Sequence, residues 1–164
     1  MYDPKVVVRL TGDCPLTDPK VIDEIVHRFI TSDFDYLSNC APPTYPDGLD
    51  VEVISMQALE KAYYQANTDY QKEHVTPYII NSKQFSKYYL THTEDLSHER
   101  WTVDEPEDLM VVTKIIEYFY PVTKILFFRL LWSELLTKGV HSQLSGKICA
   151  PCMHGIAYKR GDFL

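Results

Sequence analysis

The alternation of strand-like and helix-like segments in the first 120 residues constrains the fold more than any other feature of this sequence. Residues 5–10 (KVVVRL) form a β-branched, almost wholly apolar run, which is typical of a strand covered on both faces. A turn follows, and Asp18 and Pro19 then supply the N-cap and the first position of a helix. Its apolar face is spaced as one helical stripe: Ile22, Ile25, Val26, Phe29 and Ile30. Strand, turn and helix in this order predict an α/β unit.

The same alternation continues towards residue 120. Short apolar or alternating runs predict further strands at 35–39, 51–55, 88–91 and 100–103. Helical patterns cover 57–67, 70–82 with an interruption near Pro77, and a segment that begins at Pro106 and ends at Pro121. We therefore expect a mixed, mostly parallel sheet with helices on both faces. Residues 1–120 form this domain, and 121–164 are expected to be a helical or irregular C-terminal extension, with a helix over 124–137.

Charge and hydropathy exclude two classes of function. The chain has 164 residues and a formal net charge of −7, from 16 Lys and Arg against 23 Asp and Glu. Nucleic-acid binding needs a basic patch, and the longest basic run is Lys159-Arg160. The most apolar stretch, 122–136, is too short to span a membrane and contains charged residues. The scattered cysteines do not resemble a disulfide framework, so a cytoplasmic location is expected.

Two aspartates stand where ligands gather in α/β proteins. Asp13 follows the first strand candidate, and Asp104 follows the strand candidate at 100–103. Ligands bind outside the carboxyl ends of strands, so the two carboxylates converge if these strands are neighbours. Such a pair suits Mg²⁺, which takes few protein oxygens together with substrate phosphates. The alternative is that each aspartate only caps a turn and the following helix.

Three further groups of residues are weaker candidates. The loop around residues 45–52 carries polar and turn-forming residues that form either a pocket wall or an ordinary solvated turn: Tyr45, Asp47, Gly48, Asp50 and Glu52. His74 is either a packed or solvated helix residue or a hydrogen-bond donor to a ligand. Arg9 and Arg100 lie in strand candidates beside the two aspartates, where they can pair with acids or with phosphate.

A zinc site is not expected at the single C-x-x-C motif. Cys149 and Cys152 have one further candidate ligand nearby, His154, whereas a structural zinc site needs four. The chain also contains no G-x-G-x-x-G, no G-x-x-x-x-G-K-[ST] and no G-x-S-x-G motif. Free thiols are therefore the better interpretation of these cysteines.

Four segments together resemble one family. VVRLTGDCPLTDPKVIDE, SNCAPPTYPDGLDVEVIS, EHVTPYI and THTEDLSHERWTVDEPEDL occur here in the order and spacing of the spore coat polysaccharide biosynthesis branch of the cytidylyltransferases. That branch is similar to the acylneuraminate and 3-deoxy-manno-octulosonate cytidylyltransferases. The resemblance covers about residues 5–120 and implies a Rossmann-like nucleotide-diphospho-sugar transferase fold. It also implies that CMP is transferred from CTP to an acidic sugar with release of pyrophosphate.

The resemblance also implies roles for single residues. The metal-binding acid of the family's G-D-x-P motif falls on Asp13, and that of its V-D-x-P-E-D-L motif falls on Asp104, so both would hold Mg²⁺ and act in catalysis. The implied substrate-binding residues are Tyr45, Asp47, Gly48, Asp50, Glu52, His74 and Arg100. CTP, an acidic sugar and a second copy of the chain in a homodimer are the implied partners.

One part of the family pattern has no counterpart in this sequence. The N-terminal strand and the basic, glycine-containing loop that hold the nucleotide triphosphate are missing, so we expect an N-terminally incomplete domain. It would be either a fragment of a longer enzyme or a non-catalytic remnant that acts as a binding or assembly module. In both cases the isolated chain is expected neither to bind CTP tightly nor to turn it over.

Overall fold

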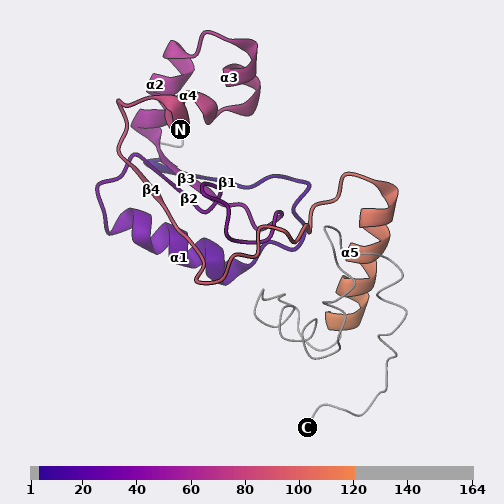
Figure 1. Ribbon diagram of the computed structural model, residues 1–164. Helices are drawn as coiled ribbons and strands as arrows, with labels where there is room; N and C mark the ends of the chain where they lie inside the picture. The colour runs from indigo at the N-terminus through magenta and orange to yellow at the C-terminus, as the bar shows by residue number, and fades with distance from the viewer. Residues whose placement is uncertain (1–3, 121–164) are drawn as a thin grey trace.

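A computed structural model describes residues 4–120 of the chain (Figure 1). This part contains four strands: β1 (Val6–Arg9), β2 (Tyr36–Ser38), β3 (Glu52–Ser55) and β4 (Lys87–Tyr89). It also contains five helices: α1 (Pro19–Ile30), α2 (Met56–Gln65), α3 (Asp69–His74), α4 (Pro77–Asn81) and α5 (Pro106–Phe119). The helix expected over 124–137 and the Cys149–Cys152 pair lie outside the described residues. Within 4–120, no helix has the length and apolar character needed to cross a membrane.

The strands form one mixed sheet in the order β1-β3-β2-β4. β3 runs antiparallel to both β1 and β2, and β2 runs parallel to β4. The sheet is mixed as expected, but its antiparallel pairings outnumber the parallel one, so the expectation of a mostly parallel sheet was wrong. The reason is the loop after β2, which returns the chain to the neighbouring position without a crossover helix. The connection from β1 to β2 passes through α1, and the connection from β3 to β4 passes through α2, α3 and α4.

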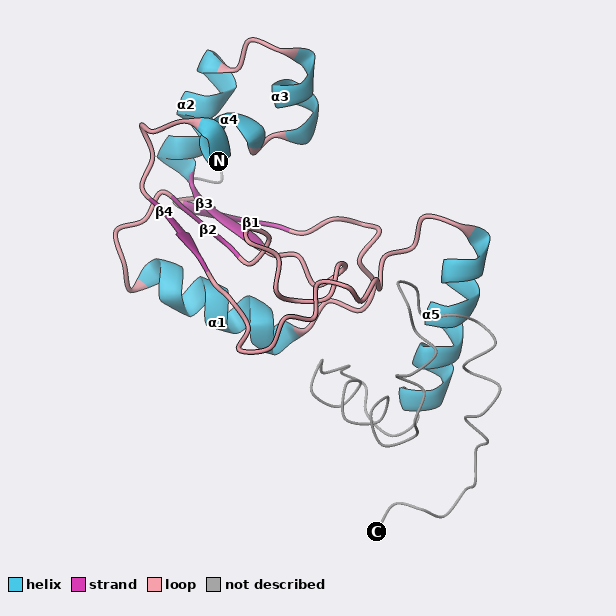
Figure 2. Ribbon diagram, in the orientation of Figure 1, coloured by secondary structure: helices cyan, strands magenta, loops and turns pink. Residues whose placement is uncertain are grey.

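Helices cover both faces of the sheet, as expected. Figure 2 shows α1 on one face and the group α2–α4 on the other. Side chains alternate between the faces along each strand. Leu37 and Val53 pack into the cluster that contains Ile25 of α1, whereas Tyr36 and Ile54 pack against the alanine face of α2.

Two strand expectations were wrong. β1 was expected to be covered on both faces, but it pairs with β3 alone among the described strands, and Val8 is 41% exposed. The segment 100–103 was expected to be a strand. It forms a single parallel bridge, between Asp47 and Arg100, because its neighbour is an irregular loop that offers no extended partner.

The helix ends follow their sequence signals. The Asp18 carboxylate accepts a hydrogen bond from the backbone N–H of Lys20 at 2.7 Å, and Pro19 opens α1. Pro106 opens α5, where Glu105 and Asp108 form a reciprocal capping box. The expected interruption near Pro77 lies at Val75, between α3 and α4. Val75 has φ 67° and ψ −57°, and the N–H of Thr76 donates to the carbonyl oxygen of His74 at 2.7 Å.

Candidate active site

The segments that carry Asp13 and Asp104 lie side by side. The backbone N–H of Val103 donates a hydrogen bond to the carbonyl oxygen of Asp13 at 2.8 Å. Asp13 stands in the turn after β1, and Asp104 stands just before α5. The turn itself is closed by a hydrogen bond from the N–H of Cys14 to the carbonyl oxygen of Thr11 at 3.3 Å. The two aspartates picked out from the sequence thus belong to adjoining stretches of backbone.

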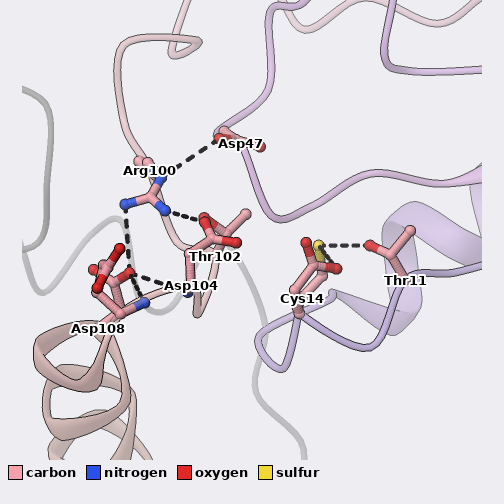
Figure 3. A network of polar contacts seen from close by, with 9 residues as sticks. Thr11, Cys14, Asp47, Arg100, Thr102, Asp104 and Asp108 are labelled. Carbon is pink, nitrogen blue, oxygen red and sulfur yellow. Dashed lines mark hydrogen bonds and ion pairs between the residues drawn. The ribbon is translucent and has the colours of Figure 1, made fainter.

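The environment of Asp13 keeps its carboxylate charged. Its pKa is lowered, chiefly by the hydrogen bond from the Thr11 hydroxyl, with smaller contributions from the Cys14 thiol and the Arg9 guanidinium, while burial opposes the shift. The Cys14 sulfur lies 3.7 Å from the Asp13 carboxylate. It also lies 3.1 Å from the Thr11 hydroxyl (Figure 3). Burial raises the pKa of the Cys14 thiol to about 11, so it is a neutral donor beside the carboxylate. Asp13 is exposed and ionised, which suits a cation ligand.

Arg100 is the centre of a cluster of three carboxylates (Figure 3). Its guanidinium forms an ion pair with Asp104, lies 3.4 Å from the Asp108 carboxylate and lies 4.0 Å from that of Asp47. The pKa of Arg100 is raised, chiefly by the hydrogen bond to Asp104. The Thr102 hydroxyl also donates to Asp104 at 3.0 Å. Of the two roles open to Arg100, the structure shows pairing with acids.

The two aspartates fit Mg²⁺ only as a site completed by other ligands. No group of three or more metal-ligating side chains comes together within residues 4–120. Mg²⁺ often takes one or two protein carboxylates and fills its remaining positions with water and substrate phosphate. Asp13 is available for that role as it stands. Asp104 is engaged by Arg100, so it would be available to a cation only if that ion pair were broken.

A polar pocket of about 260 Å³ lies between the sheet and the α3–α4 connection. It brings together four residues singled out from the sequence: Arg9, Asp50, Glu52 and His74. Thr76, a buried residue, contributes to the wall that His74 begins. Thr11 lines the pocket and its hydroxyl is hydrogen-bonded to the Asp13 carboxylate, so the pocket adjoins the candidate metal ligand.

Charge is distributed unevenly in this pocket. Glu52 is buried, forms an ion pair with Arg9 and accepts a hydrogen bond from the Tyr36 hydroxyl at 2.5 Å. Asp50 forms no ion pair within residues 4–120, and the charge of Arg9 lowers its pKa less than each neighbouring acid raises it. Burial first, and then the charges of Asp47, Glu52 and Asp13, raise its pKa to about 6. Asp50 is therefore the carboxylate in the pocket that a ligand can most readily engage.

Four of the expected substrate-binding residues lie outside the pocket wall: Arg100, described above, and Tyr45, Gly48 and Asp47. Tyr45 is buried in the core, where its ring meets that of His92 edge-on at 5.3 Å between centroids. Gly48 is buried against the backbone of Trp101, where a Cβ would lie 2.8 Å from a carbonyl carbon. Asp47 is exposed beside Arg100. The structure thus gives Tyr45 and Gly48 packing contacts and assigns Asp47 to the arginine cluster.

Sequence reasoning missed several residues that build the pocket. Thr11 and Cys40 line it, and both directly follow strands, so the rule that ligands gather at carboxyl ends of strands was the signal available. Burial raises the pKa of the Cys40 thiol to about 12. Asn39 is buried and closes the loop behind Asp50: its amide donates to the carbonyl of Leu49 and accepts from the N–H of Val51, each at 2.8 Å.

Comparison with solved structures identifies the class of protein. A cytidylyltransferase from Leptospira borgpetersenii serovar Hardjo-bovis matches with a TM-score of 0.67 and 35% sequence identity, over 70% of this chain and 50% of that one. The mixed sheet, covered by helices on both faces, is accordingly the nucleotide-diphospho-sugar transferase fold. The chain thus shares the fold of a nucleotidyltransferase, of which it covers half.

The chain belongs to the cytidylyltransferase family, whose model matches residues 1–120. An uncharacterized protein of Methanocaldococcus jannaschii is 40% identical over 121 residues, which are 72% of this chain and 49% of the relative. The spore coat polysaccharide biosynthesis protein SpsF of Bacillus subtilis is 32% identical over 111 residues, 64% of this chain and 44% of SpsF. The chain thus spans about half the length of these relatives.

Proposed function

We propose that this chain supplies the metal and acceptor side of a cytidylyltransferase, which transfers CMP from CTP to a sugar hydroxyl. The observation that carries the proposal is the hydrogen bond between Val103 and Asp13, because it joins the two acid-bearing segments in a chain of this family. The polar pocket beside Asp13 offers a place for the acceptor. SpsF, named for spore coat polysaccharide biosynthesis, supports a role in making a surface polysaccharide.

In the proposed reaction, an acceptor hydroxyl oxygen attacks the α-phosphorus of CTP in line. A new oxygen–phosphorus bond forms, the bond to pyrophosphate breaks, and the hydroxyl proton passes to solvent. Mg²⁺, when bound, would neutralise phosphate charge at the reacting centre. Asp13 and Asp104 would hold it there, and Arg100 would move from Asp104 to the phosphates. Asp50 and Thr76 would hold the acceptor by its hydroxyl groups.

The acceptor in this proposal is an acidic sugar, and the product a CMP-sugar. This finer assignment rests on the resemblance to the acylneuraminate and octulosonate cytidylyltransferases. The position of the pocket beside Asp13 is compatible with a monosaccharide acceptor whose reacting hydroxyl points towards the metal ligands.

We also propose a homodimer formed through the α2–α3 surface. A groove of about 860 Å³ runs between these helices, and the tyrosines near it are largely exposed. Glu60 and Lys72 both line the groove, so two copies related by a twofold axis can set opposite charges against each other. Analytical ultracentrifugation of the chain, compared with a Tyr64→Glu variant, tests this assembly. A monomer at all concentrations would contradict it.

Pyrophosphate release tests the transferase proposal. The assay contains CTP, Mg²⁺ and a panel of acidic sugars, with the chain alone and with any in-frame coding sequence upstream of Met1 restored. Release that requires both CTP and one sugar, and that disappears in Asp13→Asn, supports the proposal. Release that is undiminished in Asp13→Asn, or the absence of sugar-dependent release in both forms, contradicts it and favours a binding module.

A further inference from the structure

We infer that the pocket containing Asp50 binds the hydroxyl-rich part of the acceptor, uncharged or bearing an amine, and rejects carboxylate groups. That the ligand is the acceptor of the transfer rests on the proposed function. The expected preference for uncharged or amine-bearing groups follows from the charge and shape of the pocket itself. An acidic sugar would enter with its hydroxylated or amide-bearing part first, and its carboxylate would stay outside.

The fixed charges of the pocket make it an unfavourable place for an anion. Arg9 is the pocket's cation, and its ion pair with Glu52 already cancels its charge. Glu52 is further held by the Tyr36 hydroxyl, so Arg9 cannot turn to a ligand without leaving a buried carboxylate unpaired. Arg9 also acts on Asp50, but the charges of Asp47, Glu52 and Asp13 each act on it more strongly, so the surroundings of Asp50 remain negative. A ligand carboxylate inside this space would meet a like charge and no free cation.

Asp50 is placed to accept hydrogen bonds from a ligand. Among residues 4–120, no side chain or backbone N–H donates a hydrogen bond to its carboxylate, although it is half-buried. A half-buried carboxylate is stabilised by a ligand that donates hydrogen bonds to it. Sugar hydroxyls and ammonium groups are such donors. His74 and Thr76, opposite, add groups that both donate and accept.

The wall formed by His74 and Thr76 is built around an unusual turn. Val75 adopts φ 67° and ψ −57°, with a hydrogen bond from Thr76 back to His74 across it. This is a γ-turn of the rare, strained hand, and it is unfavourable for a β-branched residue. It directs His74 and Thr76 to the polar pocket while Val75 lines the groove on the other side. Strain of this kind is most often retained where it shapes a binding site.

The size of the pocket limits what enters it. At about 260 Å³ it lies just below the range of roughly 300–1,000 Å³ that is usual for ligand pockets. It is therefore suited to part of a sugar and not to a nucleotide. Because it adjoins Asp13, a sugar that reaches into it leaves its remaining groups close to the candidate metal ligands.

Three small polyols test the inference; they share a vicinal diol and carry a neutral hydroxyl, a carboxylate or an ammonium group on the third carbon. Glycerol, glycerate and 3-amino-1,2-propanediol are titrated into the ¹⁵N-labelled full chain at pH 7.5, above the pKa of about 6 of Asp50. We expect the amide signals of His74 and Thr76 to shift, with the amine binding at least threefold more tightly than glycerate and glycerol in between. Asp50→Asn should abolish the preference. Asp23→Asn, which removes an exposed carboxylate of α1, should keep it.

Each other result overturns the inference. Glycerate binding as tightly as the amine would show that the pocket accepts carboxylates. The absence of shifts at His74 and Thr76 with all three compounds would show that it is no polyol site. The titration contains neither CTP nor metal, so a chain that fails the pyrophosphate assay can still show the charge preference. An active chain without the preference would refute only this inference.

Discussion

The backbone N–H of Val103 and the carbonyl oxygen of Asp13 lie 2.8 Å apart, in a hydrogen bond between two segments distant in the sequence. Through it the turn after β1 and the approach to α5 become neighbours. Neither carboxylate takes part in the bond, so both Asp13 and Asp104 are left for other partners. Asp104 finds one in Arg100, whereas Asp13 is held by short-range hydrogen bonds that keep it charged.

Asp13→Asn and Asp104→Asn are therefore expected to weaken binding of Mn²⁺, used as a spectroscopic substitute for Mg²⁺. The loss should be at least about tenfold for each, because even outer-shell partners of a metal ligand are worth roughly 10–100-fold. Electron paramagnetic resonance of free Mn²⁺ gives the affinity, and circular dichroism checks the fold. Asp23→Asn is the control for the loss of one negative charge. Equal affinity in all three variants would rule out a shared site.

Arg100→Gln should have the opposite effect and tighten Mn²⁺ binding in the absence of nucleotide. The guanidinium competes with a cation for Asp104, and glutamine keeps some hydrogen-bonding capacity without the charge. With CTP present the gain should shrink, because the arginine is then lost as a phosphate partner. If Arg100→Gln bound Mn²⁺ more weakly than the unchanged chain in the absence of CTP, Arg100 would support the metal site and would not compete with the cation for Asp104.

Gly48→Ala should destabilise the chain strongly. Gly48 has φ 107°, and a Cβ there would meet the Trp101 carbonyl carbon at 2.8 Å and the Thr102 nitrogen at 3.0 Å, all backbone atoms that cannot move aside easily. We expect a loss of more than about 2 kcal/mol in the free energy of unfolding, whereas glycine-to-alanine changes at compatible positions stabilise a protein by roughly 0.4–1 kcal/mol. Gly12→Ala is the matched control, since nothing lies within 4 Å of its Cβ position. Urea unfolding measures both, and equal losses would contradict the packing role of Gly48.

The local elements could be predicted from the sequence because their signals are local. The Asp18-Pro19 and Glu105-Pro106 pairs mark the starts of α1 and α5, and the alternation within β3 marks the strand. Strand direction could not be predicted this way. It depends on how the loop after β2 is closed, and that is done by the buried side chain of Asn39, which bonds to backbone ten and twelve residues along the chain.

The candidate site shows the same division between local and long-range information. Asp13 and Asp104 could be chosen because each precedes a helix and follows an extended segment. The pocket could not be assembled, because Asp50, Glu52 and His74 meet only after β3 and the α3–α4 turn are placed. The partner of Arg100 was also undetermined, since acids and phosphate suit a guanidinium equally well. In the structure the guanidinium of Arg100 forms its ion pair with Asp104.

Stability should fall as the pH rises through the pKa of Asp50, which burial and neighbouring acids raise to about 6. The unfolded chain has the lower, ordinary value of 3.8, so the folded state binds more protons between these values and gains stability at acid pH. That gain is lost between about pH 4 and pH 6, and its upper limit is about 3 kcal/mol before solvent screening reduces it. Asp50→Asn should remove this loss in urea unfolding series at pH 4.5 and 7. If the free energy of unfolding of Asp50→Asn still differed between pH 4.5 and pH 7 as much as that of the unchanged chain, the pH dependence would belong to another group.

Val75→Gly should leave stability unchanged or raise it, which is unusual for a valine. The residue sits at φ 67°, where a β-branched side chain is strained by about 1–3 kcal/mol, and glycine removes that strain. The greater freedom of glycine in the unfolded chain offsets roughly 0.4–1 kcal/mol of the gain. Val8→Gly in β1 is the control, because the two valines are similarly exposed, at 37% and 41%. In the strand, glycine should cost about 1 kcal/mol or more, since no strain is relieved there. Thermal unfolding of the two variants makes the comparison, and equal destabilisation would mean that Val75 is not strained in solution.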